Sequence, residues 1–112
     1  MMSNGDRGVE RDVAEAGTSR RRVLIIDDDD EIRGMLAHVV SSSGYAPIEA
    51  GGGMAGLELA AAVAPDAVCL DLWMDDMSGL DVLDHLHYLW PELPVIIITA
   101  SACAGSRRAP RR

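Results

Sequence analysis

Three short, uniformly apolar runs constrain the fold of this chain more than any other feature of its sequence. Residues 23–26, 67–70 and 95–98 are almost entirely aliphatic, and each run is too short to form a buried helix. Such runs suit β-strands that are buried on both faces, as in a parallel sheet. Residues 45–49 add a weaker strand, which Pro47 restricts to a sheet edge or to the start of a strand.

Segments with helical character separate these strands. Apolar side chains in residues 30–43 recur at the spacing of one helix face, with Asp30 as the expected N-cap and Gly44 as the expected stop. Residues 54–63 favour a helix by composition, and residues 79–90 favour one by their apolar pattern. The order β-α-β-α-β-α-β predicts an α/β protein whose parallel sheet carries helices on both faces.

Both ends of the chain lack this periodicity. Residues 1–21 are expected to form a flexible N-terminal tail, and residues 102–112 a basic flexible tail, which leaves residues 22–101 as the structured domain. Cys69 and Cys103 lie in unlike contexts and are interpreted as free thiols. No apolar stretch is long enough to span a bilayer, and no signal peptide is visible, so we expect a cytoplasmic location without a membrane partner.

The net charge excludes one class of function. It is −8, and all ten basic residues are arginine. Nucleic-acid binding requires clustered basic side chains on a folded surface, whereas acidic residues dominate the centre of this chain. We therefore expect no nucleic-acid partner.

Carboxylates follow the predicted strands at the point where each strand ends. Asp27 and Asp28 follow the first strand, Asp71 follows the third, and Thr99 follows the fourth. If the first and third strands are neighbours, three carboxylates converge in one crevice, and close like charges oppose folding unless a cation neutralises them. Mg²⁺ prefers such oxygen ligands, and a carboxylate can then act as nucleophile toward a phosphoryl group. The other aspartates of this region are interpreted as solvated or capping residues: Asp29, Asp30, Asp75, Asp76, Asp81 and Asp84.

These motifs resemble those of a known protein family. Residues 23–101 resemble the receiver domain of bacterial response regulators. Residues 24–28 are similar to the acidic pair after the first strand of that family, and residues 70–79 to its phosphoacceptor loop, which usually reads D-x-x-M-P-x-M-x-G. Residues 98–100 resemble its switch hydroxyl followed by a small residue. The resemblance implies a flavodoxin-like doubly wound parallel sheet, here incomplete, with four strands in the order 2-1-3-4 and three helices.

The resemblance also implies roles for individual residues. Asp71 would accept a phosphoryl group from a sensor histidine kinase, and Thr99 would contact that group. Asp28 and Asp71 would bind Mg²⁺ directly, Asp27 would bind it through water, and the main-chain carbonyl of Trp73 would be a further ligand. The expected function is a signalling module of a phosphorelay and not an enzyme.

The sequence departs from the family pattern in three respects. Asp75 replaces the usual Pro, which predicts a looser and more negative loop. The chain contains no Lys, so the usual partner of the phosphoryl group is missing, and Arg107 or Arg108 is a poor substitute. The fifth strand and the last two helices have no counterpart, which predicts an impaired module. Residues 95–98 would then form an open sheet edge that is prone to self-association.

Two other functions stay open at this point. Residues 27–29 contain the D-x-D pattern of Mg²⁺-dependent phosphatases of the haloacid dehalogenase type, and residues 98–99 resemble the second motif of that class. Alternatively, the chain is a receiver remnant that no longer signals. The three histidines, His38, His85 and His87, are interpreted as surface residues.

Overall fold

The structure is a computed structural model that describes residues 20–98. Within this part of the chain, four strands form one parallel sheet with the order β3-β2-β4-β5. The strands are β2 (Arg22–Ile26), β3 (Ala46–Ala50), β4 (Ala67–Asp71) and β5 (Val95–Ile98). This order confirms the predicted arrangement 2-1-3-4, and β3, which contains Pro47, lies at a sheet edge as expected.

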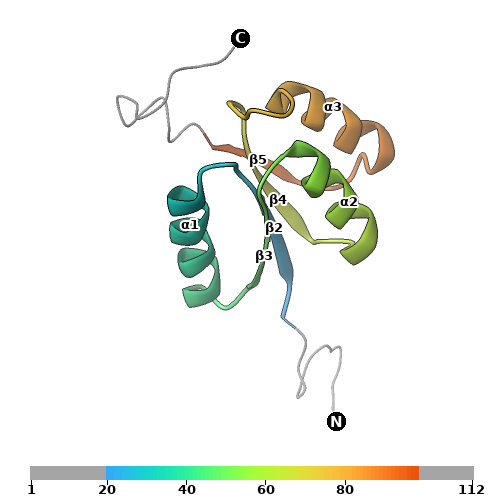
Figure 1. Ribbon diagram of the computed structural model, residues 1–112. Coiled ribbons are helices and arrows are strands. Elements are labelled where there is room, and N and C mark those ends of the chain that lie inside the picture. Colours follow the sequence, from blue (N-terminus) through green and yellow to red (C-terminus); the bar gives the residue numbers. More distant parts are fainter. Residues whose placement is uncertain (1–19, 99–112) are drawn as a thin grey trace.

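Three helices connect the strands and cover both faces of the sheet. They are α1 (Asp30–Ser42), α2 (Gly53–Val63) and α3 (Gly79–Leu89). Helix α1 lies on one face, while α2 and α3 lie side by side on the other (Figure 1). The predicted doubly wound, flavodoxin-like sheet is therefore confirmed. No helix in residues 20–98 is long and apolar enough to cross a membrane.

The alternation of side chains along the central strands divides the core into two parts. Leu24 and Ile26 face α2 and α3, where they join a cluster that includes Val82 and Leu86. Val23 and Ile25 of the same strand face α1, where they join a smaller cluster with Cys69 of β4 and Ala37 of α1. Because both faces of β2 and β4 are buried, these strands consist of continuous apolar residues, as the sequence predicted.

Helix α1 begins one residue earlier than its predicted cap implies. Asp29, and not Asp30, is the N-cap, because its Oδ1 accepts hydrogen bonds from the main-chain N–H groups of Glu31 (3.0 Å) and Ile32 (3.1 Å). At the other end, Gly44 adopts φ 93°, a left-handed conformation that suits glycine. Tyr45 donates its N–H to Val40, which closes this turn and delays β3 until Ala46.

The apolar faces predicted for α1 and α3 are only partly buried. Ile32, Val82 and Leu86 are buried, whereas four other members of these faces are exposed: Met35, Val39, Leu80 and Leu89. Each of these two helices therefore buries a narrower stripe of apolar side chains than its periodicity predicts. The expected tails at 1–21 and 102–112 lie almost entirely outside the described residues.

Candidate functional site

Three carboxylates meet at the carboxyl ends of the two central strands. Strands β2 and β4 are neighbours with Ile26 opposite Leu70, so the residues that follow are brought together. Asp27, Asp28 and Asp71 each offer an oxygen atom, and these atoms all lie within 4.8 Å of one another. The structure thus unites the three carboxylates that the sequence singled out.

Two of the three carboxylates are almost completely buried. Asp27 is 2% exposed and Asp71 is 1% exposed, whereas Asp28 is partly exposed. Main-chain N–H groups of the following loops satisfy them in part. Asp29 donates its N–H to Oδ1 of Asp27 (2.9 Å), and Trp73 donates its N–H to Oδ1 of Asp71 (3.2 Å). These bonds orient two buried charges that would be costly without polar partners.

The donor set fits Mg²⁺. All three side chains offer carboxylate oxygens, which Mg²⁺ prefers, and the partly exposed side at Asp28 leaves access for water. A divalent cation would also relieve the repulsion between three carboxylates held this close together. The three carboxylates therefore form a candidate Mg²⁺ site.

Gly79 fixes the path of the loop that leaves Asp71. Its N–H donates to the carbonyl oxygen of Leu72 (3.0 Å), and a Cβ atom at Gly79 would collide with the main chain of Asp71 and Leu72. The start of α3 therefore lies directly against the main chain that carries the central carboxylate. Ser78 caps this helix by accepting the N–H of Leu80 (3.1 Å).

The structure argues against a loose loop at Asp75. The main-chain N–H of Asp75 donates a hydrogen bond to Oδ2 of Asp28 over 2.7 Å. A proline has no N–H and cannot make this bond. The departure from the family pattern therefore adds a contact between the loop and a candidate metal ligand.

Arg33 is a component of the site that the sequence did not single out. Its Nη1 donates to the carbonyl oxygen of Asp27 (2.8 Å), and its other nitrogens contact Glu49 (3.2 Å) and Asp30 (2.6 Å). Burial alone would lower the pKa of Arg33, but the hydrogen bonds that it donates to Asp30 and Glu49, together with the charges of these carboxylates, outweigh burial and raise that pKa. The spacing from Asp30 to Arg33 suggests an i,i+3 ion pair, but the contacts with Asp27 and with Glu49 in β3 depend on the fold.

An open cleft of about 430 Å³ lies beside the carboxylates. Its lining includes three acidic residues, Asp28, Asp75 and Asp76, and the small residues at the start of α2. The cleft gives solvent and small ions a route to the partly exposed carboxylate of Asp28.

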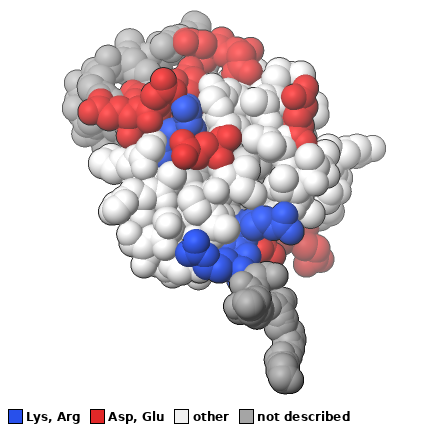
Figure 2. All heavy atoms as spheres, turned by 60° about the horizontal axis from the view of Figure 1, so that its bottom comes forward, with Lys and Arg blue, Asp and Glu red and all other residues white. Residues whose placement is uncertain are grey.

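Charge is distributed unevenly over the described surface. Arg20, Arg21 and Arg22 are exposed where β2 begins, at the opposite end of the sheet from the carboxylates. Figure 2 shows a basic patch on the lower part of this face, well separated from most of the acidic side chains. The site therefore lies in the acidic part of the molecule, which suits a cation.

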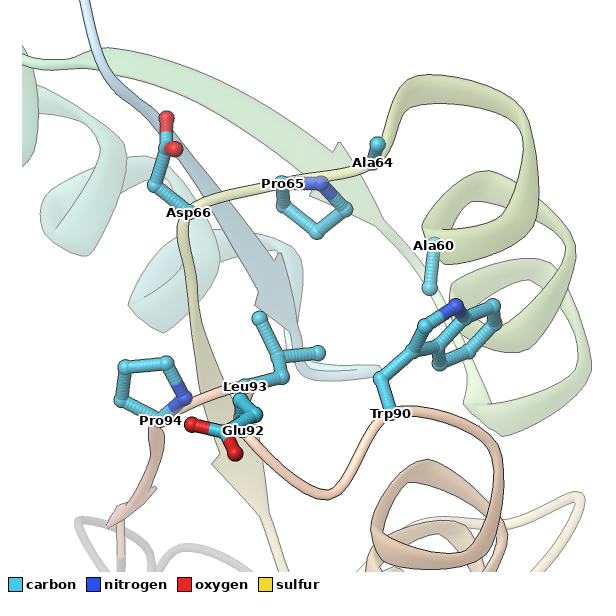
Figure 3. Close-up of a pocket in the computed structure, with 8 residues that line it drawn as sticks. All are labelled: Ala60, Ala64, Pro65, Asp66, Trp90, Glu92, Leu93 and Pro94. Atoms are coloured by element: carbon cyan, nitrogen blue, oxygen red, sulfur yellow. The ribbon is translucent and has the colours of Figure 1, made fainter.

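A second hollow, of about 290 Å³, lies at the amino-terminal ends of β4 and β5. It is lined mainly by apolar side chains of the segments that follow α2 and α3, including Pro65, Trp90 and Leu93 (Figure 3). The carboxylate of Asp66 at this hollow accepts the main-chain N–H of Arg22 (2.8 Å). This hollow is remote from the three clustered carboxylates and offers no similar ligand set.

The remaining candidate residues fall into two groups. His38, His85 and His87 are exposed, as expected, and the His85 ring contacts the carbonyl oxygen of Asp81 (2.9 Å). Thr99 lies outside the described residues, although β5 ends at Ile98, which is paired with Asp71. Cys103 and the arginines considered as substitutes for lysine, Arg107 and Arg108, also lie outside them.

Comparison with known proteins identifies relatives over most of the chain. The family model for the response regulator receiver domain matches residues 23–108. The response regulator MprA of Mycolicibacterium vanbaalenii is 36% identical over 88 residues, which cover 79% of this chain and 38% of the relative. MprA of Mycobacterium leprae is 35% identical over the same share of this chain and 39% of its own length. The chain thus spans less than half the length of these curated relatives.

Solved structures show the same fold. The response regulator TrrA of Thermotoga maritima, solved in complex with Mg²⁺-BeF, matches with a TM-score of 0.70 and 30% identity over 71% of this chain and 70% of that one. A CheY-like receiver domain protein of Methanospirillum hungatei also gives 0.70, with 26% identity over 80% of this chain and 78% of that one. CheY4 of Vibrio cholerae gives 0.68 at 23% identity, over 78% and 77% of the two chains, which supports the fold alone.

Proposed function

Because this chain belongs to the response regulator receiver domain family, we propose that it accepts a phosphoryl group from a sensor histidine kinase on Asp71. Receiver domains are parts of two-component signalling systems and typically act as signalling modules, not as catalysts. The cytoplasmic location expected from the sequence belongs to the same proposal.

One observation carries this proposal. Asp71 ends β4 beside Asp27 and Asp28, and the oxygen atoms of the three carboxylates lie within 4.8 Å of one another. Asp71 is the last residue of β4, whereas Asp27 and Asp28 both follow β2. The loop after Asp71 lines two open hollows. An acceptor needs this combination of a fixed carboxylate and a route for an incoming group.

The proposed transfer replaces a phosphorus–nitrogen bond of the donor with a phosphorus–oxygen bond to Asp71. A carboxylate oxygen of Asp71 forms a bond to phosphorus while the bond between phosphorus and a histidine nitrogen of the donor breaks. The imidazole nitrogen keeps the electron pair of that bond and takes up a proton, and the product is an aspartyl phosphate. The N–H of Trp73, which donates to Oδ1 of Asp71, helps to fix the orientation of this carboxylate.

Asp28 and Asp71 would hold Mg²⁺ directly, with Asp27 acting through water and the carbonyl of Trp73 as a further ligand. When bound, Mg²⁺ neutralises charge on the transferred phosphoryl group. Thr99 is proposed to contact this group through its hydroxyl. The carboxylate of Asp29 caps α1 by accepting the N–H of Glu31. The second aspartate of the D-x-D pattern at residues 27–29 is therefore engaged in the helix cap, which argues against a phosphatase of that class.

Intact-mass measurement tests the proposal. The full chain is incubated with Mg²⁺ and a small-molecule phosphodonor, and we expect a mass gain of one phosphoryl group. Asp71→Asn should abolish the gain, whereas Asp84→Asn, the same change at an exposed position of α3, should retain it. A gain that persists in Asp71→Asn would place the phosphoryl group on another residue and refute the assignment.

A further inference from the structure

Two consecutive residues tie the loop after Asp71 to two other parts of the fold. The N–H of Asp75 donates to Oδ2 of Asp28, at the end of β2, over 2.7 Å. The carboxylate of Asp76 accepts the N–H of Gly53 at Oδ1 (2.9 Å) and the N–H of Met54 at Oδ2 (3.0 Å), both at the start of α2. The loop is thus held on both sides of the cleft that borders the carboxylates.

The contact from Asp75 acts on a candidate metal ligand. Asp28 is the most accessible of the three carboxylates, so its side chain has the greatest freedom to turn away from Asp27 and Asp71. A hydrogen bond to Oδ2 restricts this freedom. Because the donor is a main-chain N–H, every residue except proline can supply it at this position.

The contact from Asp76 completes a helix that has no cap of its own. Gly52 is the N-cap of α2 and offers no side-chain acceptor, and the first turn of α2 contains no acidic residue. The first N–H groups of a helix need acceptors, and a negative charge there is favoured by the helix dipole. Asp76 meets both requirements from another segment of the chain.

The packing around this contact is tight. A Cβ atom at Gly53 would collide with the side chains of Met77 and Val82, and one at Gly52 would lie 3.0 Å from Oδ2 of Asp76. The start of α2 and the loop after Asp71 therefore fit together with no room for a side chain between them. A shift of the loop must break the Asp76 contacts.

We propose that Asp75 and Asp76 form a two-point clamp that holds the loop and Asp28 in the arrangement for binding Mg²⁺ before the ion arrives. Both are positioning residues: neither needs to touch the ion or the phosphoryl group. The clamp rests on the proposed function, since it presupposes a metal at the three carboxylates.

The first test separates the N–H of Asp75 from its charge. Asp75→Ala and Asp75→Pro both remove the carboxylate, but only the proline variant loses the hydrogen bond to Asp28. Mg²⁺ affinity is measured by calorimetry on the full chain. We expect the Kd of Asp75→Pro to exceed that of Asp75→Ala by about tenfold, the low end of what losing a partner of a metal ligand costs.

The second test leaves the main chain of the loop unchanged, so it holds even if the proline variant does not fold. In the metal-free protein, Asp76→Ala should increase amide hydrogen exchange at Gly53 and Met54 by about tenfold, because each N–H loses its acceptor. It should also weaken Mg²⁺ binding several-fold. Asp76→Asn retains one acceptor oxygen and should lie between, and Asp84→Ala should change neither quantity.

The outcomes distinguish the two proposals. If the wild-type chain binds no Mg²⁺, the proposed function fails. If it binds Mg²⁺ but Asp75→Pro matches Asp75→Ala, or Asp76→Ala accelerates exchange without changing the Kd, the contacts only stabilise the fold and the clamp is refuted. Weaker binding in both variants, with faster exchange at the start of α2, supports it.

Discussion

Arg33 donates a hydrogen bond from Nη1 to the main-chain carbonyl oxygen of Asp27 over 2.8 Å. The guanidinium comes from α1, whereas Asp27 directly follows β2 and its side chain belongs to the carboxylate cluster. Further contacts with Glu49 in β3 and Asp30 in α1 make Arg33 a bridge between three elements. The hydrogen bond from Arg33 fixes the main chain at Asp27, and the side chain of Arg33 is only 16% exposed.

Arg33→Ala should therefore destabilise the protein by about 1 kcal/mol, because it removes the hydrogen bond to the carbonyl oxygen of Asp27, while the ion pairs with Asp30 and Glu49 are exposed to solvent and contribute little. Urea unfolding measures this loss. Arg33→Lys should recover only part of it, since an ammonium group cannot reproduce three divergent contacts. Equal stability of Arg33→Ala and the wild-type chain would show that the bridge contributes nothing.

The strand order and the meeting of Asp27, Asp28 and Asp71 could be predicted from the sequence, and the role of Arg33 could not. Buried parallel strands have continuous apolar sequences, which makes them visible in the sequence. Because neighbouring parallel strands end at the same edge of the sheet, a residue that follows such a strand is expected to lie at the site. Arg33 lies in a helix among several polar residues. Its contacts with Asp27, which follows β2, and with Glu49 in β3 depend on how α1 packs on the sheet, which no local pattern specifies.

Mg²⁺ should stabilise the folded chain through the three carboxylates. A ligand that binds only the folded state raises the free energy of unfolding by about 2.7 kcal/mol at 100 times its Kd. Urea unfolding with and without Mg²⁺ measures this increase, and Trp73 fluorescence, two residues from Asp71, should respond in a titration. Asp28→Asn should reduce the increase strongly. Equal stability with and without saturating Mg²⁺ would contradict a metal site here.

Removing the charge of Asp71 should have the opposite effect in the metal-free protein. Asp71→Asn relieves repulsion from two nearby carboxylates, and its amide oxygen can still accept the N–H of Trp73. We expect a gain on the order of 1 kcal/mol in the absence of Mg²⁺, because charges at this separation interact at least this strongly. The same variant should lose the stabilisation by Mg²⁺. A loss of stability in metal-free buffer would show that repulsion is not the dominant interaction.

The contacts of Asp76 predict a dependence of stability on pH. Burial opposes its ionisation, but the N–H groups of Met54 and Gly53 outweigh this and lower its pKa below the ordinary value of 3.8. A lowered folded-state pKa contributes stability that is present above the unfolded-state pKa and is lost as the pH falls through the folded-state value. The stability difference between wild type and Asp76→Asn should therefore be constant above about pH 5 and shrink as the pH falls through the ordinary value of 3.8 and the lower folded-state pKa. Asp84→Asn, the matched control, should show no comparable change, and a constant difference for Asp76→Asn would contradict the assignment.

Asp75 and Asp76 show why the details of the loop could not be predicted. From the sequence both were interpreted as solvated or capping residues, and Asp76 is indeed a cap, but it caps α2, which begins 23 positions earlier in the chain at Gly53. The contact of Asp75 uses its main chain, which every residue other than proline shares. Only the absence of proline at this position was visible in the sequence, and its consequence depends on where Asp28 lies.

The last prediction concerns strand β5, which lies at the edge of the described sheet. Ile96 is 53% exposed and Ile97 is 39% exposed, although their side chains point to opposite faces. An apolar, β-branched edge strand without charges favours pairing with another chain. We expect self-association, which light scattering after size-exclusion chromatography measures.

Ile96→Lys should reduce this self-association, because a charge on an edge strand opposes pairing. Met35→Lys, at a residue that is 59% exposed on α1, provides the matched control and should leave association unchanged. A monodisperse wild-type monomer that melts cooperatively above about 60 °C, near the upper end of the range for mesophilic domains, would show that this edge does not drive association.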